Sequence, residues 1–242
     1  MSDFDKVCEF NRCFDFPVHK DMKDEKCRKL RLDLIEEELN ELKKAFEEND
    51  VVEEQDACAD ILYVAYGMAY TYEINSDYVM NNRYYLINKE TLFKSLMYNL
   101  SDRQTILTKL FDVFNNLTKY TNEQNIDGMS EFLHEIIYNV YNFQFVSGYD
   151  SDRVFQIVHD SNMSKLCKDE TEAVLTVKDY EQKYSDGKSP YDSPYYYKLD
   201  NGMYVVKNKS TGKALKNINY IKVKLNLHPW RFKMRQSQII KL

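Results

Sequence analysis

The sequence predicts a mainly α-helical protein with a small β-meander near its C-terminal end. Only six glycines and four prolines occur in 242 residues, and they are rarer still before residue 165, which favours long helices over many tight turns. Apolar residues recur at helical spacing before that point, whereas the tail alternates apolar and polar residues as strands do. Because 43% of the residues are hydrophobic, the chain can bury a core.

The first predicted helix contains the sequence LIEEELNEL, residues 34–42, and places carboxylates on one face. Glu38 and Glu41 are three residues apart, a spacing that stacks two side chains on the same side of a helix. Glu37 lies beside them and points partly away. Eleven residues separate Glu41 from Glu53, which is enough to end this helix and begin another through a loop near Asn49.

The second predicted helix runs through the apolar sequence DACADILYVAYGMAY, residues 56–70, and is expected to be buried. Three carboxylates belong to its start, namely Glu53, Asp56 three residues later, and Asp60 one turn further on. Acidic groups near an apolar helix are costly to bury unless something pairs with them. If the two helices pack side by side, a cation must neutralise their carboxylates, and oxygen ligands favour Mg²⁺ with a phosphate substrate. The alternative for either motif alone is a solvated acidic helix face.

The middle of the chain is similar to the second helix when residues 131–154 are set against residues 56–79, an offset of 75. Six of the 24 positions are identical. A helix over residues 92–120 then corresponds to the helix with the glutamates, but the carboxylates are absent from this copy. The residues that match Glu38, Glu41 and Glu53 are Val113, Asn116 and Gly128.

Two interpretations of this similarity remain open. The first is a decayed internal duplication, with one repeat over residues 20–80 and a degenerate one over residues 92–155. The second is a plain helical insertion whose pattern matches by chance, because helical periodicity alone produces weak similarity. Both interpretations predict that residues 81–149 are mostly helical.

A basic extension, residues 167–242, is expected to follow a helical bundle over residues 1–166. After a helix that begins near Asp152, the sequence predicts a short helix over residues 169–183 and a loop over residues 185–194. Turn sequences at residues 200–202 and 210–212 divide a three-stranded meander over residues 194–226, whose last strand is NYIKVKL.

Charge is divided unevenly along the chain. The formal net charge is −6, but residues 198–242 carry eleven Lys or Arg and one acid, a net of +10, so the rest carries −16. Lys213 and Lys216 are candidates for contact with phosphate, and Trp230 and Arg231 for a nucleic-acid surface. We favour a solvated tail over residues 227–242 and a structural cover with phosphate contacts over residues 194–226.

The carboxylate motifs resemble the signature of the all-α nucleoside triphosphate pyrophosphohydrolases, a superfamily that includes MazG-like proteins, dimeric dUTPases and phosphoribosyl-ATP pyrophosphohydrolases. That signature is EExxE followed by ExxD on neighbouring helices, and here it reads Glu37-Glu38-x-x-Glu41 and then Glu53-x-x-Asp56. Three further stretches are similar to segments of one MazG-like branch and occur in the family's order. They are DACADILYVAYG at residues 56–67, VFQIVHDSNMSKL at residues 154–166 and TGKALKNINY at residues 211–220.

The resemblance implies a helical bundle with a Mg²⁺ site, in which Mn²⁺ can substitute. We expect four carboxylates to hold the ion, with Asp60 as a support behind them. Glu37 and Glu38 are the expected catalytic residues, and Glu37 is expected to orient or deprotonate the attacking water or to hold a second ion. The four expected metal ligands are Glu38, Glu41, Glu53 and Asp56.

Substrate contacts are also implied by the resemblance. It gives Asn162 a contact with the base or sugar and Lys165 a contact with phosphate, whereas Ser161 and Asn162 would otherwise form a helix C-terminal cap. Arg31 lies two turns before the glutamate cluster and is expected either to touch phosphate or to pair with nearby acids.

We therefore expect a Mg²⁺-dependent enzyme that converts (d)NTPs to (d)NMPs and pyrophosphate, with a dUTP-preferring enzyme as a close variant. It is expected to act as a homodimer or as a pseudo-dimeric single chain. The alternative is a catalytically silent helical protein that binds nucleotide or nucleic acid through its basic tail. A cytoplasmic location is expected, because the N-terminus lacks a signal-peptide pattern, no apolar run spans a membrane, and five cysteines show no metal or disulfide spacing.

Overall fold

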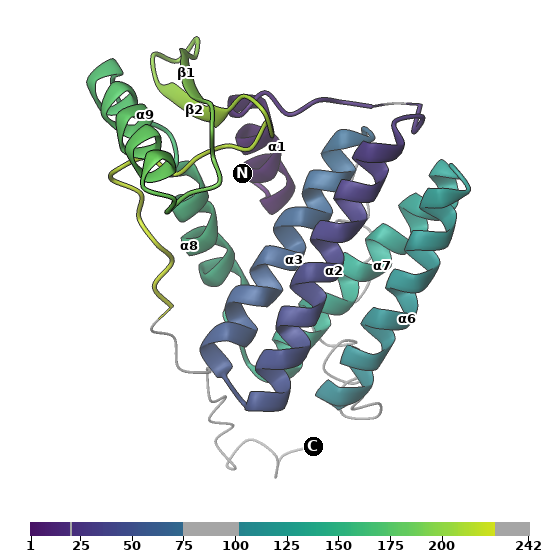
Figure 1. Cartoon of the computed structure of the whole chain (residues 1–242). Coiled ribbons are helices and arrows are strands. Elements are labelled where there is room, and N and C mark those ends of the chain that lie inside the picture. Colours follow the sequence, from purple (N-terminus) through teal and green to yellow (C-terminus); the bar gives the residue numbers. More distant parts are fainter. Residues whose placement is uncertain (20, 75–101, 226–242) are drawn as a thin grey trace. The chain divides into compact units, whose positions relative to one another are not determined.

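The computed structural model describes residues 1–19, 21–74 and 102–225, and the chain divides into two compact units (Figure 1). We call residues 19–155 the helical unit, and residues 1–18 together with residues 156–224 the terminal unit. The units therefore meet in the chain between residues 155 and 156, whereas the sequence suggested a domain boundary at residue 166. The described residues contain seven helices and a two-stranded antiparallel sheet, which confirms the mainly α fold class.

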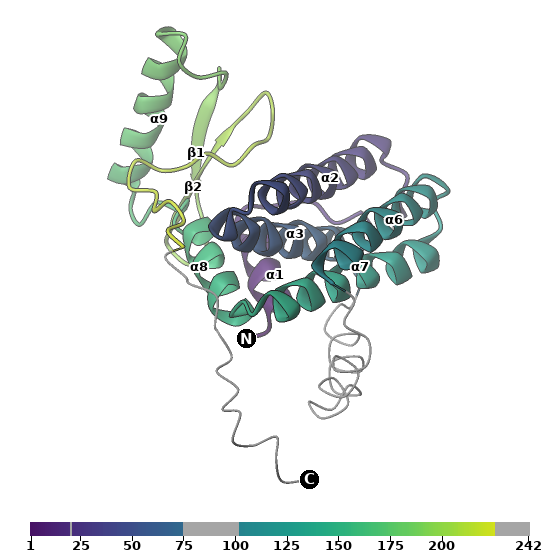
Figure 2. The same cartoon turned by 90° about the horizontal axis from the view of Figure 1, so that it is seen from below.

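The helical unit consists of two helical hairpins that pack against each other. The first hairpin is α2 (Glu25–Glu48) with α3 (Val51–Thr71), and the second is α6 (Arg103–Asn122) with α7 (Ile126–Ser147). Figure 2 shows α2 beside α3 and α6 beside α7. Contacts between α3 and α7 and between α2 and α6 join the hairpins into one bundle.

Each of these four helices begins at a side chain that caps its first turn. Asp24, Asp50, Asp102 and Asn125 each accept a hydrogen bond from a backbone N–H two or three residues later. Such caps satisfy donors that an α-helix leaves without a partner at its start, and each stabilises a helix by about 1 kcal/mol.

The centre of the helical unit is α3, as the sequence predicted. Of residues 57–69, only Asp60 and Val64 are not fully buried. The many small residues of α3 let neighbouring helices approach on several sides, so the helix lies inside the bundle rather than on its surface. None of the described helices is both long enough and apolar enough to cross a membrane.

The turns of the two hairpins have the same backbone conformation at positions 75 residues apart. Asn49, the C-cap of α2, and Gln124, which follows the C-cap of α6, both lie in the left-handed region, with φ of 57° and 56°. The next residues, Asp50 and Asn125, have φ and ψ of −85° and 91° in one case and −91° and 97° in the other. The two turns therefore match residue by residue at the predicted offset of 75.

The same offset applies at the far ends of α3 and α7. Glu73 has a φ of 53° and Gly148 a φ of 73°, and each lies just after its helix. Tyr66 and Tyr141 are also 75 residues apart, and their hydroxyl oxygens lie 3.2 Å from each other. The duplication stays a prediction, because short loops between antiparallel helices favour few conformations whatever their origin. The part of the sequence comparison that covers residues 75–79 lies outside the described residues, as does the start of the predicted helix over residues 92–120.

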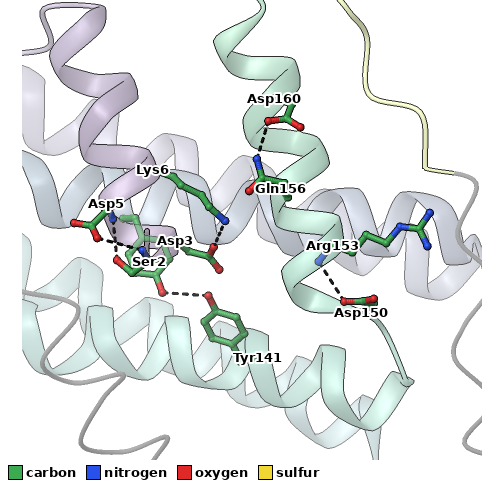
Figure 3. A network of polar contacts seen from close by, with 10 residues as sticks. Ser2, Asp3, Asp5, Lys6, Tyr141, Asp150, Arg153, Gln156 and Asp160 are labelled. Carbon is green, nitrogen blue, oxygen red and sulfur yellow. Dashed lines mark hydrogen bonds and ion pairs between the residues drawn. The ribbon is translucent and has the colours of Figure 1, made fainter.

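The terminal unit begins with α1 (Asp3–Cys13), whose N-terminus has a capping box. Ser2 and Asp5 exchange backbone-to-side-chain hydrogen bonds of 3.1 Å, and Lys6 pairs with Asp3 at 2.9 Å (Figure 3). The helix α8 (Ser151–Met163) starts in the helical unit and ends in the terminal unit, and α9 (Glu170–Ser185) follows it. The prediction of a short helix over residues 169–183 is thereby confirmed.

A hairpin of β1 (Pro194–Lys198) and β2 (Tyr204–Asn208) completes the terminal unit. Its turn contains Gly202 at a φ of 86°, a conformation that glycine adopts without strain. The hairpin and α9 enclose a small core. The fully buried residues of this core are Cys167, Ala173, Val206 and Leu215.

The predicted third strand, NYIKVKL, is wrong, since residues 219–225 form no strand. Two isolated bridges extend the sheet at β2, one between Cys167 and Tyr204 and one between Lys207 and Ala214. The backbone within this segment instead bonds to the chain around the end of α8. Ile221 donates its N–H to the hydroxyl of Ser164 at 3.0 Å, and its carbonyl accepts from Ser161 at 2.8 Å. These bonds replace the ladder that the alternating pattern predicted.

Candidate functional site

The carboxylates of α2 lie on the helix that packs along α3. Leu32, Ile35, Leu39 and Leu42 are buried and fix which side of α2 faces the core. Glu38 lies at the edge of this apolar stripe and is half-buried, whereas Glu37 and Glu41 are exposed. Glu38 is therefore the glutamate of this motif that packing draws closest to α3.

The acidic residues of α3 differ in the same way. Asp56 and Asp60 are half-buried and four residues apart, so they lie on one side of the helix. Glu53 is exposed in the first turn, where its N–H donates to the side chain of Asp50 at 3.1 Å.

Glu38 is the residue on which these carboxylates converge. Its pKa is raised to about 8, mainly because burial penalises the charged form, and further by the charges of four neighbours. Asp60 has the largest effect among them, followed by Glu41, Glu37 and Asp56. Five carboxyl groups from α2 and α3 therefore form one electrostatic cluster, which we call the acidic cluster.

Glu53 is not among the four neighbours named as raising the pKa of Glu38. A helix rises about 1.5 Å per residue, so Glu53 lies roughly 10 Å along α3 from Asp60. The sequence motif paired Glu53 with Asp56, whereas the two acids of α3 named as raising the pKa of Glu38 are Asp60, which has the largest charge effect of the four neighbours, and Asp56, which has the smallest. The four-residue spacing of these two aspartates is the signal that points to this pair.

The donor set of the acidic cluster fits a hard cation. All five members offer carboxylate oxygens, which suit Mg²⁺ and Mn²⁺ rather than softer metals. Within the described residues, no three His, Cys, Asp or Glu side chains already stand in the close arrangement of a metal site. Like charges repel, so carboxylates without an ion between them are expected to point apart and to converge when a cation binds.

The second hairpin offers an internal comparison. At positions 75 residues later, Val113 replaces Glu38 and Glu135 replaces Asp60. There the acid has a basic partner on the neighbouring helix, because Lys109 of α6 lies 3.8 Å from Glu135. In the first hairpin an acid faces acids, and in the second an acid faces a lysine. The two hairpins therefore differ in charge at these matching positions.

Arg31 lies on the same side of α2 as Glu38, seven residues before it and thus about two turns away. It is buried, and burial lowers the pKa of its guanidinium, while the neighbouring Cys27 and Tyr72 act in the opposite direction. A guanidinium about two turns along α2 from the acidic cluster is of the kind that binds phosphate oxygens.

The other predicted substrate contacts belong to the terminal unit. Asn162 and Lys165 lie together, and the Lys165 ammonium donates to the Asn162 side-chain oxygen at 2.6 Å. The same ammonium lies 5.5 Å from the centre of the Phe10 ring. Lys213 and Lys216 are exposed and lie over tyrosine rings rather than beside acids. Trp230 and Arg231 lie outside the described residues.

One acidic residue of functional interest was missed by the sequence analysis. Glu54 lies between the predicted ligands and is 1% exposed, with Arg103 and Tyr149 as partners. Its position is four residues before Cys58 and seven before Ile61, both fully buried, so it belongs to the apolar stripe of α3. That periodicity was the available signal, but nothing local in the sequence identifies partners 49 and 95 residues away.

Comparison with known proteins adds two findings. The family model described as phosphoribosyl-ATP pyrophosphohydrolase matches residues 7–83, which include every carboxylate of the acidic cluster. A relative from Acanthamoeba polyphaga mimivirus, named "Uncharacterized protein L479", is 39% identical over 235 residues, covering 89% of this chain and 91% of that protein. No solved structure matches the chain.

Proposed function

We propose that this protein hydrolyses nucleoside triphosphates to monophosphates and pyrophosphate with Mg²⁺. The chain belongs to the all-α nucleoside triphosphate pyrophosphohydrolase superfamily, and the proposal starts from this membership. The family supports a pyrophosphohydrolase in general terms. The nucleotide substrate, the Mg²⁺ dependence and a preference for dUTP belong to our proposal, as does the substitution of Mn²⁺.

The acidic cluster is the observation that carries this proposal. Glu38 is half-buried on α2, and the packing of α2 against α3 sets four other carboxyl groups around it. Such a gathering is unfavourable by itself and becomes favourable with a divalent cation. At the matching position of the second hairpin, Glu135 instead has the ammonium of Lys109 3.8 Å away.

The residues then have separate roles. Glu38, Glu41, Asp56 and Asp60 would hold the ion, with Glu53 at the exposed end of the set. Bound Mg²⁺ offsets the negative charge that develops on phosphate oxygens as a P–O bond breaks. Glu37, exposed beside the cluster, would orient the attacking water and accept its proton.

Positive side chains would bind the triphosphate. Arg31, on the cluster side of α2, is suited to phosphate oxygens because its planar guanidinium donates two parallel hydrogen bonds. Lys165 would bind phosphate and Asn162 the base or sugar, and their contact at 2.6 Å favours their acting as one group. Lys213 and Lys216 are exposed and would add weaker, screened attraction.

Pyrophosphate release from a panel of (d)NTPs with Mg²⁺ tests the proposal. We would compare the wild type with Glu38→Gln and with Glu36→Gln, an exposed glutamate of the same helix that does not act on Glu38. The proposal predicts release by the wild type and by Glu36→Gln, and loss in Glu38→Gln. Absence of release from every nucleotide, with Mg²⁺ and with Mn²⁺, would contradict it.

A second candidate function is nucleic-acid binding by a catalytically silent protein. The observation in its favour is a set of exposed lysines on and around the hairpin of the terminal unit, beside the 41% exposed ring of Tyr195. A short single-stranded DNA that raises the melting temperature more than Mg²⁺ with a non-hydrolysable triphosphate would favour this function. The exposed lysines are Lys198, Lys209, Lys213 and Lys216.

A further inference from the structure

Glu54 of α3 lies in an environment opposite in charge to that of the acidic cluster. Its carboxylate is 1% exposed and accepts hydrogen bonds from the guanidinium of Arg103 and from the hydroxyl of Tyr149. Both donors reach one oxygen, Oε2. Glu54 is therefore a buried acid that the protein neutralises with its own residues.

Arg103 is held in place by aromatic rings as well as by Glu54. Its guanidinium carbon lies 4.9 Å from the centre of the Phe46 ring and 5.1 Å from that of Phe143. A guanidinium over aromatic faces gains a further attraction, which is stronger when water is excluded. The carboxylate of Glu54 thus pairs with the charge of Arg103, and the two aromatic rings fix the orientation of its guanidinium plane.

The residues of this group come from the ends of all four helices of the bundle. Phe46 lies in the last turn of α2, Glu54 in the first turn of α3, and Arg103 is the first residue of α6. Phe143 lies in the last part of α7, and Tyr149 follows the residue that ends it. We call Glu54, Arg103 and Tyr149 the anchor triad.

The anchor triad lies on the other side of α3 from the aspartates of the acidic cluster. Successive residues of a helix turn by about 100°, so Glu54 lies roughly 160° around α3 from Asp56 and roughly 120° from Asp60. A helix held on one side by buried charged hydrogen bonds cannot turn about its axis without breaking them. The direction in which Asp56 and Asp60 point is therefore coupled to the bonds that Glu54 makes.

We propose that Glu54, Arg103 and Tyr149 are positioning residues that set the rotation of α3 and so aim Asp56 and Asp60 at Glu38. This inference rests on the proposed function, since it assigns the triad a role in holding the cation of that site. Glu54 differs in role from its neighbour Glu53, which is exposed, although the two stand side by side in the sequence.

A purely structural role would have a different signature. Breaking a buried charge pair destabilises a protein whatever the pair positions. Only a positioning role also weakens cation binding under conditions in which the variant is fully folded. The test therefore needs a variant of similar stability that leaves the triad intact.

The experiment compares Glu54→Gln with Leu117→Ala, which removes a fully buried side chain of α6. All measurements are made well below the melting temperature of both variants. The readouts are the Mg²⁺ concentration for half-maximal pyrophosphate release and the rise in melting temperature that Mg²⁺ produces without nucleotide. We call the Mg²⁺ concentration for half-maximal pyrophosphate release the Mg²⁺ midpoint. We expect Glu54→Gln to raise this midpoint by about tenfold or more, as the loss of a group that orients metal ligands does. Leu117→Ala should leave the midpoint within about twofold of the wild type, the ordinary error of such comparisons.

A second variant keeps the test informative if Glu54→Gln does not fold. Tyr149→Phe keeps the pair of Glu54 and Arg103 and removes one hydrogen bond, so a smaller rise in the Mg²⁺ midpoint is expected. Equal Mg²⁺ midpoints in wild type, Tyr149→Phe and Glu54→Gln would overturn the positioning role while leaving the proposed function intact. A wild type that shows neither a Mg²⁺-dependent rise in melting temperature nor pyrophosphate release would overturn the proposed function, and this inference with it.

Discussion

At the scale of single residues, Glu38 is an acid whose protonation changes on folding. Its pKa rises from an ordinary 4.5 to about 8, because burial and four carboxylates disfavour its charge. Between these two pH values the folded chain holds a proton that the unfolded chain has lost. Stability without metal must therefore fall as pH rises through this window, since folding then favours the protonated form.

This pH dependence is measurable by comparison with Glu38→Gln, which cannot titrate at this position. The difference in metal-free melting temperature between the variant and the wild type should grow in favour of the variant as pH rises from 4.5 to about 8, and level off above that. Saturating Mg²⁺ should reverse the trend for the wild type, because the ion displaces the proton. A difference that stays constant across this range would refute the assigned shift.

Asp60 and Glu53 give a second prediction for single residues. Asp60 has the largest charge effect on Glu38, whereas Glu53 is exposed and is not among the four neighbours named as acting on it. Asp60→Asn should therefore lower pyrophosphate release by at least about tenfold more than Glu53→Gln, in line with the usual effect of losing a ligand or its orienting partner. Initial rates at saturating substrate and Mg²⁺ check this. Equal losses of pyrophosphate release in the two variants would instead support the pairing of Glu53 with Asp56 that the sequence motif predicted.

At the level of helices and turns, the two hairpins provide matched controls for each other. Asp50 caps α3 and Asn125 caps α7 at the corresponding position. Replacing either with Ala should lower the free energy of unfolding by about 1 kcal/mol, the usual effect of losing an N-cap. Only Asp50→Ala should also raise the Mg²⁺ midpoint, because α3 carries Asp56 and Asp60 in the turns that follow.

Denaturant unfolding and Mg²⁺ titration of pyrophosphate release measure the two effects separately. A rise in the Mg²⁺ midpoint for Asn125→Ala as large as that for Asp50→Ala would mean that general loosening of the bundle, rather than the start of α3, controls the site.

The same elements show how far the sequence could predict this protein. Apolar residues at helical spacing identified α3, and the turn at Gly202 identified the hairpin, because these signals are local. The third strand failed, since alternation shows only that a segment can form a strand. Ser161 and Ser164, about 60 residues earlier in the chain, bond the backbone of this segment instead.

The candidate site, too, was predictable only where the signal is local in the sequence. The spacing of Glu38, Glu41 and Asp56 indicated a cluster, and the structure brings these residues together with Asp60. The role of Glu54 was not predictable, because it depends on Arg103 and Tyr149, which reach it only through the packing of four helices.

At the scale of the whole molecule, the acidic cluster belongs to the helical unit and the candidate phosphate-binding lysines belong to the terminal unit. Lys165 is half-buried and bonded to Asn162, whereas Lys213 is exposed. Lys165→Gln should raise KM for the triphosphate by about tenfold, the effect of roughly 1.4 kcal/mol of lost binding energy. It should leave the Mg²⁺-induced rise in melting temperature unchanged. Lys213→Gln should change KM by less than about threefold at physiological salt, since exposed charges are screened.

These two variants test whether the units contribute separately to substrate and to metal binding. Steady-state kinetics gives the KM values, and thermal unfolding with Mg²⁺ alone gives the metal response. A Lys165→Gln variant with unchanged KM would remove Lys165 from the substrate site and leave Asn162 and Lys165 as a local structural pair.

The central claim is that the acidic cluster of α2 and α3 binds a divalent cation, and direct Mn²⁺ binding tests it most simply. Free Mn²⁺ would be measured by electron paramagnetic resonance during titration of the full chain, with a non-hydrolysable triphosphate present, for wild type, Glu38→Gln and Glu36→Gln. We predict saturable binding by the wild type and by Glu36→Gln, competition by Mg²⁺, and loss of binding in Glu38→Gln. Equal binding by Glu38→Gln, or no saturable binding by the wild type, would contradict the claim.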